Sequence, residues 1–207
     1  MILYGAPGSG KGTQAVMLAE DLNLRKISLG DILRQEVKRE SPLGQEVKSF
    51  MEKGLLVPDG LVSRVIEENI DGQGFLLDGY PRNLSQAQKL EEILQKKNTD
   101  IDAFVYLFVD EGTIVDRLTK RRICPKCGAN YHLANMPPKK DGICDNCGTD
   151  LVQRKDDTVD VIKKRWEVFS QASEELLNFY KQRDKLIEVD ARGDKDDIFE
   201  KIKNILK

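Results

Sequence analysis

Residues near the start of the chain have the types and the order that bind phosphate groups. The segment 5–13 reads GAPGSGKGT and follows a short apolar run over 1–4. Its glycines let the backbone turn so that N–H groups face an anion, and Lys11 supplies a mobile charge for the outer phosphates. A glycine-rich turn with a surface lysine is the alternative. Ala15, Leu18, Ala19 and Leu22 continue with helical spacing, and a strand, loop and helix in this order predict a nucleotide site.

One residue of this loop departs from the commonest phosphate-binding pattern. Gly12 follows Lys11 where Ser or Thr usually supplies a hydroxyl to Mg²⁺, and Thr13 comes one residue later. Mg²⁺ keeps several of its waters in most protein sites. We therefore expect the nucleotide phosphates and water, more than the protein, to hold this metal.

A second segment, 74–82, combines a carboxylate with an arginine and reads GFLLDGYPR. It predicts a buried strand that ends at Asp78, where a carboxylate beside the phosphate loop can orient magnesium-bound water. The alternative is that Asp78 only caps the next turn. Arg82 directly follows Pro81, and this rigid neighbour favours an arginine placed for a phosphate.

All four cysteines fall in two C-x-x-C-G segments. Cys124 and Cys127 form the first, Cys144 and Cys147 the second, with sixteen residues between the two pairs. This spacing predicts a closed, four-sulfur structural zinc site. Two disulfides and an iron–sulfur centre are the alternatives. His132, the one histidine of the chain, is not needed as a ligand and is expected to be structural.

The elements that position these groups alternate along the chain. Apolar strand patterns occur at 1–4, 26–28, 74–77, 103–109 and 186–189, and helical patterns at 61–70, 84–94, 113–118, 161–180 and 198–206. Such alternation predicts an α/β fold, a doubly wound parallel sheet with helices on both faces and a ligand beyond the carboxyl ends of the strands. Two stretches interrupt the pattern: 30–57 is helical without a strand, and 120–157 holds the cysteines.

Composition limits the function classes. The 207 residues fit one domain with insertions, and a net charge of −2 gives no global basic field for nucleic acid. No apolar run approaches the roughly 20 residues of a membrane helix. No charged-then-apolar leader precedes the first strand, so the sequence predicts a cytoplasmic protein without membrane or nucleic-acid partners.

Together these motifs resemble the adenylate kinases, in their long form with a zinc-bearing lid. The resemblance covers nearly the whole chain and rests on the phosphate loop, on 27–34 (ISLGDILR), on 74–82, on the four cysteines and on 154–157 (RKDD). It implies a five-stranded P-loop core (1–27, 58–119 and 158–207), a helical nucleoside-monophosphate-binding domain (28–57) and a zinc lid domain (120–157). It also implies a monomer that uses ATP with Mg²⁺ and AMP as substrates.

The resemblance also assigns roles to residues, by position. It implies ATP contacts at Gly8, Ser9, Gly10, Lys11, Gly12, Thr13, Arg117, Arg121, Asn130, Tyr131 and Gly193. It implies AMP contacts at Leu29, Arg34, Leu55, Leu56, Val57, Gly79, Tyr80, Pro81, Arg82, Gln86, Arg154 and Arg165. Lys11, Arg82, Arg121, Arg154 and Arg165 are expected to stabilise the transferred phosphoryl group, with Asp78 at the magnesium water shell. An ionised AMP phosphate needs no general base.

Three positions differ from the family pattern. Leu29 replaces a threonine beside AMP, 190–193 (DARG) replaces an Asp-Gly pair near the donor base, and Tyr4 ends the first strand where an aliphatic residue is usual. Leu29 motivates an alternative, a UMP/CMP kinase or a broad-specificity nucleoside monophosphate kinase. The cysteines and the basic run 120–122 motivate a remote one, a zinc-ribbon nucleic-acid-binding protein switched by ATP. The lack of interleaved aromatic residues argues against the remote one.

Overall fold

The computed structural model describes residues 1–71 and 74–206. Residues 72, 73 and 207, which the predicted core domain includes, lie outside the described part. Within that part no helix is both long enough and apolar enough to cross a membrane.

The centre of the molecule is the predicted five-stranded sheet, with strand order β2-β3-β1-β4-β7 and every neighbouring pair parallel. Its strands are β1 (Ile2–Gly5), β2 (Arg25–Ser28), β3 (Phe75–Asp78), β4 (Phe104–Phe108) and β7 (Leu186–Asp190). The fold-class prediction is confirmed. Each observed strand begins and ends within one residue of the apolar pattern that predicted it, since hydrogen bonding and not apolar character defines where a strand ends.

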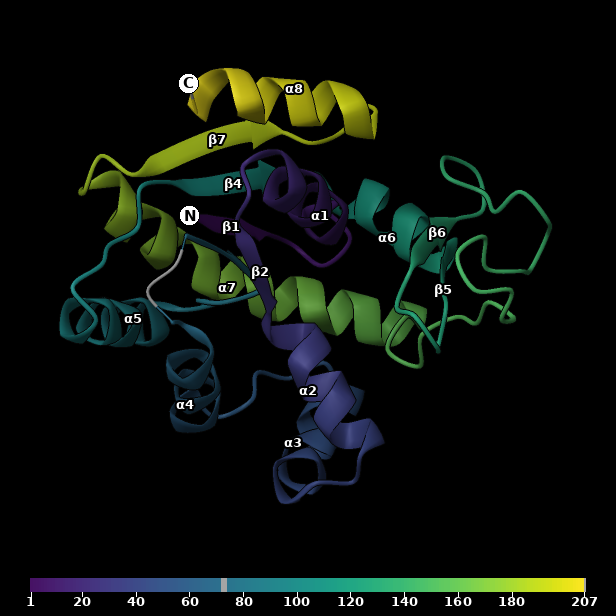
Figure 1. Cartoon of the computed structure of the whole chain (residues 1–207), viewed down its shortest axis with the longest axis horizontal. Coiled ribbons are helices and arrows are strands. Elements are labelled where there is room, and N and C mark those ends of the chain that lie inside the picture. The colour runs from purple at the N-terminus through teal and green to yellow at the C-terminus, as the bar shows by residue number, and fades with distance from the viewer. Residues whose placement is uncertain (72–73, 207) are drawn as a thin grey trace.

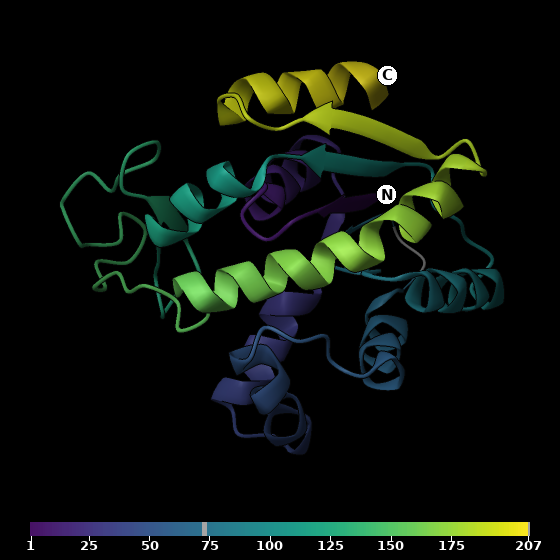
Figure 2. The same ribbon diagram turned by 180° about the vertical axis from the view of Figure 1, so that it is seen from behind.

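Helices cover both faces of this sheet (Figures 1 and 2). They are α1 (Lys11–Asp21), α2 (Leu29–Lys38), α3 (Pro42–Glu52), α4 (Asp59–Asn69), α5 (Leu84–Lys96), α6 (Glu111–Thr119), α7 (Val159–Lys181) and α8 (Lys195–Leu206). On one face, the first apolar core cluster joins the sheet to α4, α5 and α7 and reaches into α2 and α3. On the other, the second cluster joins the sheet to α1, α6 and α8.

Local sequence explains where several helices begin. Ser41 caps α3 by accepting a hydrogen bond from the Gly44 N–H at 3.0 Å, and Pro42 takes the first helical position. Asn83 caps α5 in the same way through the Gln86 N–H at 2.8 Å. Asp110 caps α6 through the Thr113 N–H at 2.9 Å. These caps fix the direction in which each helix leaves its strand.

The helices α2 and α3 form an arm that projects from the sheet (Figure 1). Their backbones touch at Gly44, where an added Cβ would lie 2.1 Å from the carbonyl oxygen of Glu36. Only glycine fits this close approach. The two helices therefore pack as one body, which carries the residues between Ser28 and Val57.

The cysteine-rich segment forms a second projection beside α6 and the start of α7 (Figures 1 and 2). Two short antiparallel strands, β5 (Arg121–Ile123) and β6 (Asn130–His132), make a small sheet, which an isolated bridge between Ile123 and Val152 extends. The sequence predicted no strands here. Its apolar cluster holds only Cys124, Tyr131 and Cys144 as buried members.

Candidate active site

A cavity of about 690 Å³ lies beyond the carboxyl ends of β1 and β3, where the arm, the cysteine-rich projection and the phosphate loop meet. Most predicted site residues line it. They are Gly8, Ser9, Gly10, Lys11, Gly12, Thr13, Arg34, Leu55, Leu56, Val57, Asp78, Gly79, Pro81, Arg82, Arg117, Arg121, Asn130, Tyr131, Arg154, Arg165 and Gly193. Segments from the whole length of the chain thus contribute to one polar chamber.

The phosphate loop lies at the floor of this cavity. Gly8 and Gly10 have φ angles of 87° and 94°, a left-handed conformation that favours glycine. The loop leads directly into the first turn of α1, whose N–H groups and positive end attract anions. Lys11 begins that helix, and its Nζ donates hydrogen bonds to the carbonyl oxygens of Gly5 and Ala6 at 2.6 and 2.8 Å.

Burial lowers the pKa of Lys11 to about 7, Asp78 raises it in part, and Arg82, Arg165 and Arg121 lower it further. Four positive groups therefore influence one another in this chamber. Such a cluster has its lowest energy when a polyanion lies among the cations.

Two of the arginines are held by neighbouring carboxylates. Arg121 forms a two-pronged pair with Asp157, with N···O distances of 2.8 and 2.5 Å. Arg165 donates to the carboxylate of Asp156 at 2.9 Å. The Asp157 side chain is fully buried. The motif at 154–157 includes Asp156 and Asp157 but predicts no role for them. Only the fold shows which arginine each carboxylate pairs with.

Arg154 carries a different signal. Burial lowers its pKa, and the nearby Arg121 and Arg34 lower it further. Its Nε is buried and has no hydrogen-bond partner among the described residues, while its terminal nitrogen donates to the Asn130 side chain at 3.1 Å. An unpaired guanidinium nitrogen beside the cavity is a donor available to an anionic ligand.

Arg82 is positioned by a chain of contacts behind the cavity wall. Its N–H donates to Oε1 of Gln86 at 2.8 Å, and Nε2 of Gln86 donates to Asp59 at 2.7 Å. Its side chain donates back to the carbonyl oxygen of Gly79 at 2.8 Å. The carboxylate of Asp78, the last residue of β3, lies 3.8 Å from the place that a Cβ on Gly12 would take, and is therefore beside the phosphate loop.

Three predicted acceptor contacts, Leu29, Tyr80 and Gln86, do not line the cavity. Leu29 is 2% exposed and packs in the first core cluster at the start of α2. The Tyr80 hydroxyl lies 3.0 Å from that of Ser63 and donates to the Gln86 carbonyl at 3.1 Å. The prediction that Leu29 contacts the acceptor has no support in the cavity's shape, because its side chain points into the core.

The opposite end of the cavity gathers the predicted donor-base residues Arg117, Asn130, Tyr131 and Gly193, and adds two further side chains, Arg192 and His132. Both Ala134 and Asn135 donate backbone N–H groups to Nδ1 of His132, at 3.2 and 3.0 Å. No local sequence pattern indicates this contact, because it depends on the turn after β6.

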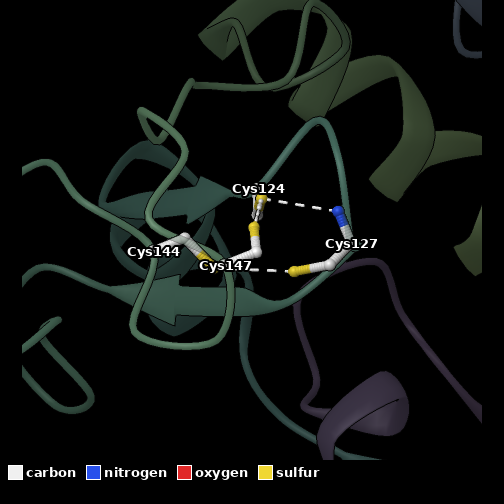
Figure 3. Close-up of side chains that lie close together, drawn as sticks. All are labelled: Cys124, Cys127, Cys144 and Cys147. Atoms are coloured by element: carbon white, nitrogen blue, oxygen red, sulfur yellow. Dashed lines mark hydrogen bonds between the residues drawn. The ribbon is translucent and has the colours of Figure 1, made fainter.

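The four cysteines converge between the ends of β5 and β6 (Figure 3). All four sulfurs lie within 4.8 Å of one another, and the Cys124–Cys147 and Cys127–Cys144 pairs lie 3.4 and 3.5 Å apart. A zinc ion bound to four sulfurs at about 2.3 Å requires S···S separations near 3.8 Å, so the cluster fits that ion. Gly128 and Gly148 have φ angles of 77° and 69° and turn the chain back after each pair.

The comparisons with known proteins agree with this site. The family model described as adenylate kinase matches residues 3–185. An adenylate kinase of Bacillus pumilus is 44% identical over 210 residues, which cover 100% of this chain and 97% of the relative. Adenylate kinases of Clostridium tetani and of the archaeon Methanocella arvoryzae are each 43% identical over 210 residues, with the same shares covered.

Proposed function

The chain belongs to the adenylate kinase family, and from this premise we propose that its cavity transfers a phosphoryl group reversibly from ATP to AMP, giving two ADP. The observation that carries the proposal is the meeting of Lys11, Arg82, Arg121 and Arg165 in one chamber. These cations come from four separate segments of the chain. Their convergence suits phosphate groups that approach from two directions, as the phosphates of ATP and AMP would when both nucleotides are bound.

The reaction requires alignment and charge stabilisation. An oxygen of the AMP phosphate forms a bond to the γ-phosphorus of ATP while the bond from that phosphorus to the β–γ bridging oxygen breaks. No proton is transferred, because the attacking oxygen is ionised at neutral pH. Lys11 and the arginines stabilise the charge that spreads over the transferred group. Guanidinium forks bind phosphate oxygens in pairs, which also fixes the line of attack.

The two ends of the cavity divide the substrates between them. We assign the ATP phosphates to the phosphate loop and its base to the end formed by Arg117, Tyr131 and Gly193. AMP is assigned to the opposite end, between Arg34, Val57 and Arg82. Gln86 and Tyr80 act behind this wall, since Gln86 accepts the Arg82 N–H and Tyr80 donates to the Gln86 backbone.

Two metals complete the proposal. Mg²⁺, arriving with ATP, neutralises phosphate charge, and Asp78 is the carboxylate that we assign to its water shell. The sulfurs of four cysteines would hold zinc and so stabilise the lid: Cys124, Cys127, Cys144 and Cys147. Because four sulfurs close the coordination shell, that metal has no open position for chemistry.

We further propose that the arm (28–57) and the cysteine-rich projection (120–157) act as the two mobile inserts around a fixed core. One contact already joins them, a hydrogen bond of 3.2 Å from the Lys38 side chain to the carbonyl oxygen of Pro125. Contact between the inserts closes the space above the phosphates. Closure excludes water, which would otherwise compete with AMP for the γ-phosphoryl group.

A coupled assay of ATP + AMP ⇌ 2 ADP in both directions tests the function. We expect AMP to be the best acceptor when initial rates with AMP, CMP, UMP and GMP are compared. A preference for CMP or UMP would instead support the alternative pyrimidine kinase, and equal rates would support a broad-specificity one. Salt-sensitive binding to RNA without kinase activity would overturn the proposal.

A further inference from the structure

Tyr4 carries a buried hydroxyl that has no hydrogen-bond partner among the described residues. The residue is 4% exposed and is the next-to-last residue of β1, one position before the phosphate loop that begins at Gly5. Its ring is fixed by three aromatic neighbours, with ring centroids 5.1 Å from Phe104, 5.8 Å from Tyr106 and 5.3 Å from Phe169. The ring therefore belongs to the core, while its polar end is left unpaired.

Tyr4 borders the cavity, close to a cation. Tyr4 is one of the residues that line it, and the Arg82 guanidinium is close enough to lower the pKa of the Tyr4 hydroxyl in part. Burial and the neighbouring Tyr106 outweigh that effect and raise the pKa. The hydroxyl thus keeps its proton throughout the working range of pH and is a neutral donor beside a positive group.

The packing of Tyr4 places it on the acceptor side. It belongs to the first core cluster together with Leu33 and Val57, which also line the cavity. The cavity residues Leu118 and Ile198, near the donor end, belong to the second cluster on the other face of the sheet. Tyr4 therefore lies near Arg82, on the side of the cavity to which we assign the AMP phosphate.

We propose that the Tyr4 hydroxyl donates a hydrogen bond to the phosphate of the acceptor nucleotide, next to Arg82. The inference rests on the proposed function and adds a positioning residue to it. A buried donor without a partner costs free energy in the free protein, and a phosphate oxygen is the acceptor that would remove this cost. Arg34 and Arg82 on this wall are charged, whereas the Tyr4 hydroxyl would add direction without adding charge.

The test compares Tyr4→Phe with Tyr106→Phe. Each substitution removes one hydroxyl and keeps the ring, and Tyr106 packs against Tyr4 but does not line the cavity. We expect Tyr4→Phe to raise KM for AMP about tenfold, as for a hydrogen bond to a charged group, with KM for ATP unchanged. Tyr106→Phe should leave both constants unchanged.

Two further readouts separate phosphate contact from packing. The inhibition constant of adenosine, which lacks the phosphate, should be the same for wild type and Tyr4→Phe, although AMP binding weakens. The Tm of ligand-free Tyr4→Phe should equal or exceed that of wild type, because an unpaired buried hydroxyl is gone. The increase of Tm on adding AMP should be smaller than in wild type.

Unchanged AMP binding in Tyr4→Phe, or an equal loss for AMP and adenosine, would overturn the inference. Either result leaves the proposed function intact, since wild-type turnover of ATP and AMP tests that separately. A wild-type protein without that turnover would instead remove the function, whatever the two variants do.

Discussion

The two walls of the cavity are stabilised by different physics. The sheet-side wall rests on two large apolar clusters, in which Ile2, Leu3 and Phe104 are fully buried. The cysteine-rich wall has a cluster with three buried members, two of which are cysteines that we assign to the metal. Each Å² of buried apolar surface stabilises the folded state by about 25 cal/mol. The first wall buries enough apolar surface to be stable on this basis, whereas the second buries very little. The cations that we propose for catalysis are divided between the two walls.

This difference means that the two walls can fail separately. Loss of apolar packing would unfold the core and everything attached to it, whereas loss of the metal should affect one projection only. Arg121 lies at the root of that projection and Arg165 on α7, and Asp157 contacts both, at 2.5 and 3.8 Å. The proposed chemistry therefore depends on a junction between an apolar core and a projection that we expect to need a metal.

Metal removal should have the largest effect. Ligation in structural zinc sites is worth roughly 10 kcal/mol of local folding free energy. We expect a chelated, thiol-modified sample to lose activity and thermal stability but to keep most of its far-UV helical signal. Elemental analysis should find close to one metal per chain, and zinc rather than iron. A purified active protein without metal would show that apolar packing alone holds the lid.

Lys11→Met comes next and acts on the core wall alone. It removes a charge from the transferred phosphoryl group without removing core volume, so kcat should fall by about 10²- to 10³-fold with an unchanged circular dichroism spectrum. Lys203→Met is the matched control, since Lys203 pairs with Asp21 at 2.6 Å away from the cavity. Retention of more than about a tenth of wild-type kcat would place Lys11 away from the reacting phosphates.

The arginines allow a paired test across the junction. Arg121→Lys and Arg165→Lys keep the positive charge but lose the guanidinium fork, so each should lower kcat by roughly ten- to a hundredfold, as expected for a charged hydrogen bond of about 1.5–3 kcal/mol. Because each arginine also pairs with an aspartate, thermal unfolding should be measured beside kcat. If kcat stayed at the wild-type value in Arg121→Lys but fell strongly in Arg165→Lys, only the core wall would stabilise the transferred phosphoryl group.

The smallest expected effect is the uptake of a proton when ATP binds. In the free protein the pKa of Lys11 is lowered to about 7, mainly by burial, and ATP phosphates should raise it again. When ATP binds at about pH 8, Lys11 should then take up close to one proton. For the same reason, the affinity for ATP should fall as the pH rises above about 7. Titration calorimetry in two buffers of different ionisation enthalpy measures this uptake. It should vanish in Lys11→Met, and equal heats for wild type in both buffers would contradict it.

Much of this structure is predictable from sequence because its signals are local. Three short motifs, each of about a dozen residues or fewer, indicate their chemistry without distant contacts. They are the phosphate loop, the strand that ends at Asp78, and the C-x-x-C-G segment, which occurs twice. The five strands follow from apolar runs, and the order of elements predicts a parallel sheet.

What escaped prediction depends on distant contacts. Gln86 is held by Asp59, 27 residues earlier, and is not among the residues that line the cavity. Its expected contact with AMP stays a prediction. Leu29 follows β2 directly, and only the packing of α2 on the sheet shows that its side chain enters the core. The strands β5 and β6 have no apolar alternation, since short polar strands beside a metal cluster do not need it.

Asp156 and Asp157 also bear on how quickly the enzyme can release what it binds. These carboxylates pair with Arg165 and Arg121, at 2.9 and 2.5 Å. A phosphate that enters the chamber therefore exchanges one anionic partner for another instead of meeting bare cations. The binding free energy of a phosphate is therefore smaller than the number of arginines suggests. When a product phosphate leaves, the aspartates can pair with the arginines again. An enzyme that runs near equilibrium in both directions benefits from such internal counter-ions, because neither ADP nor ATP becomes a trap.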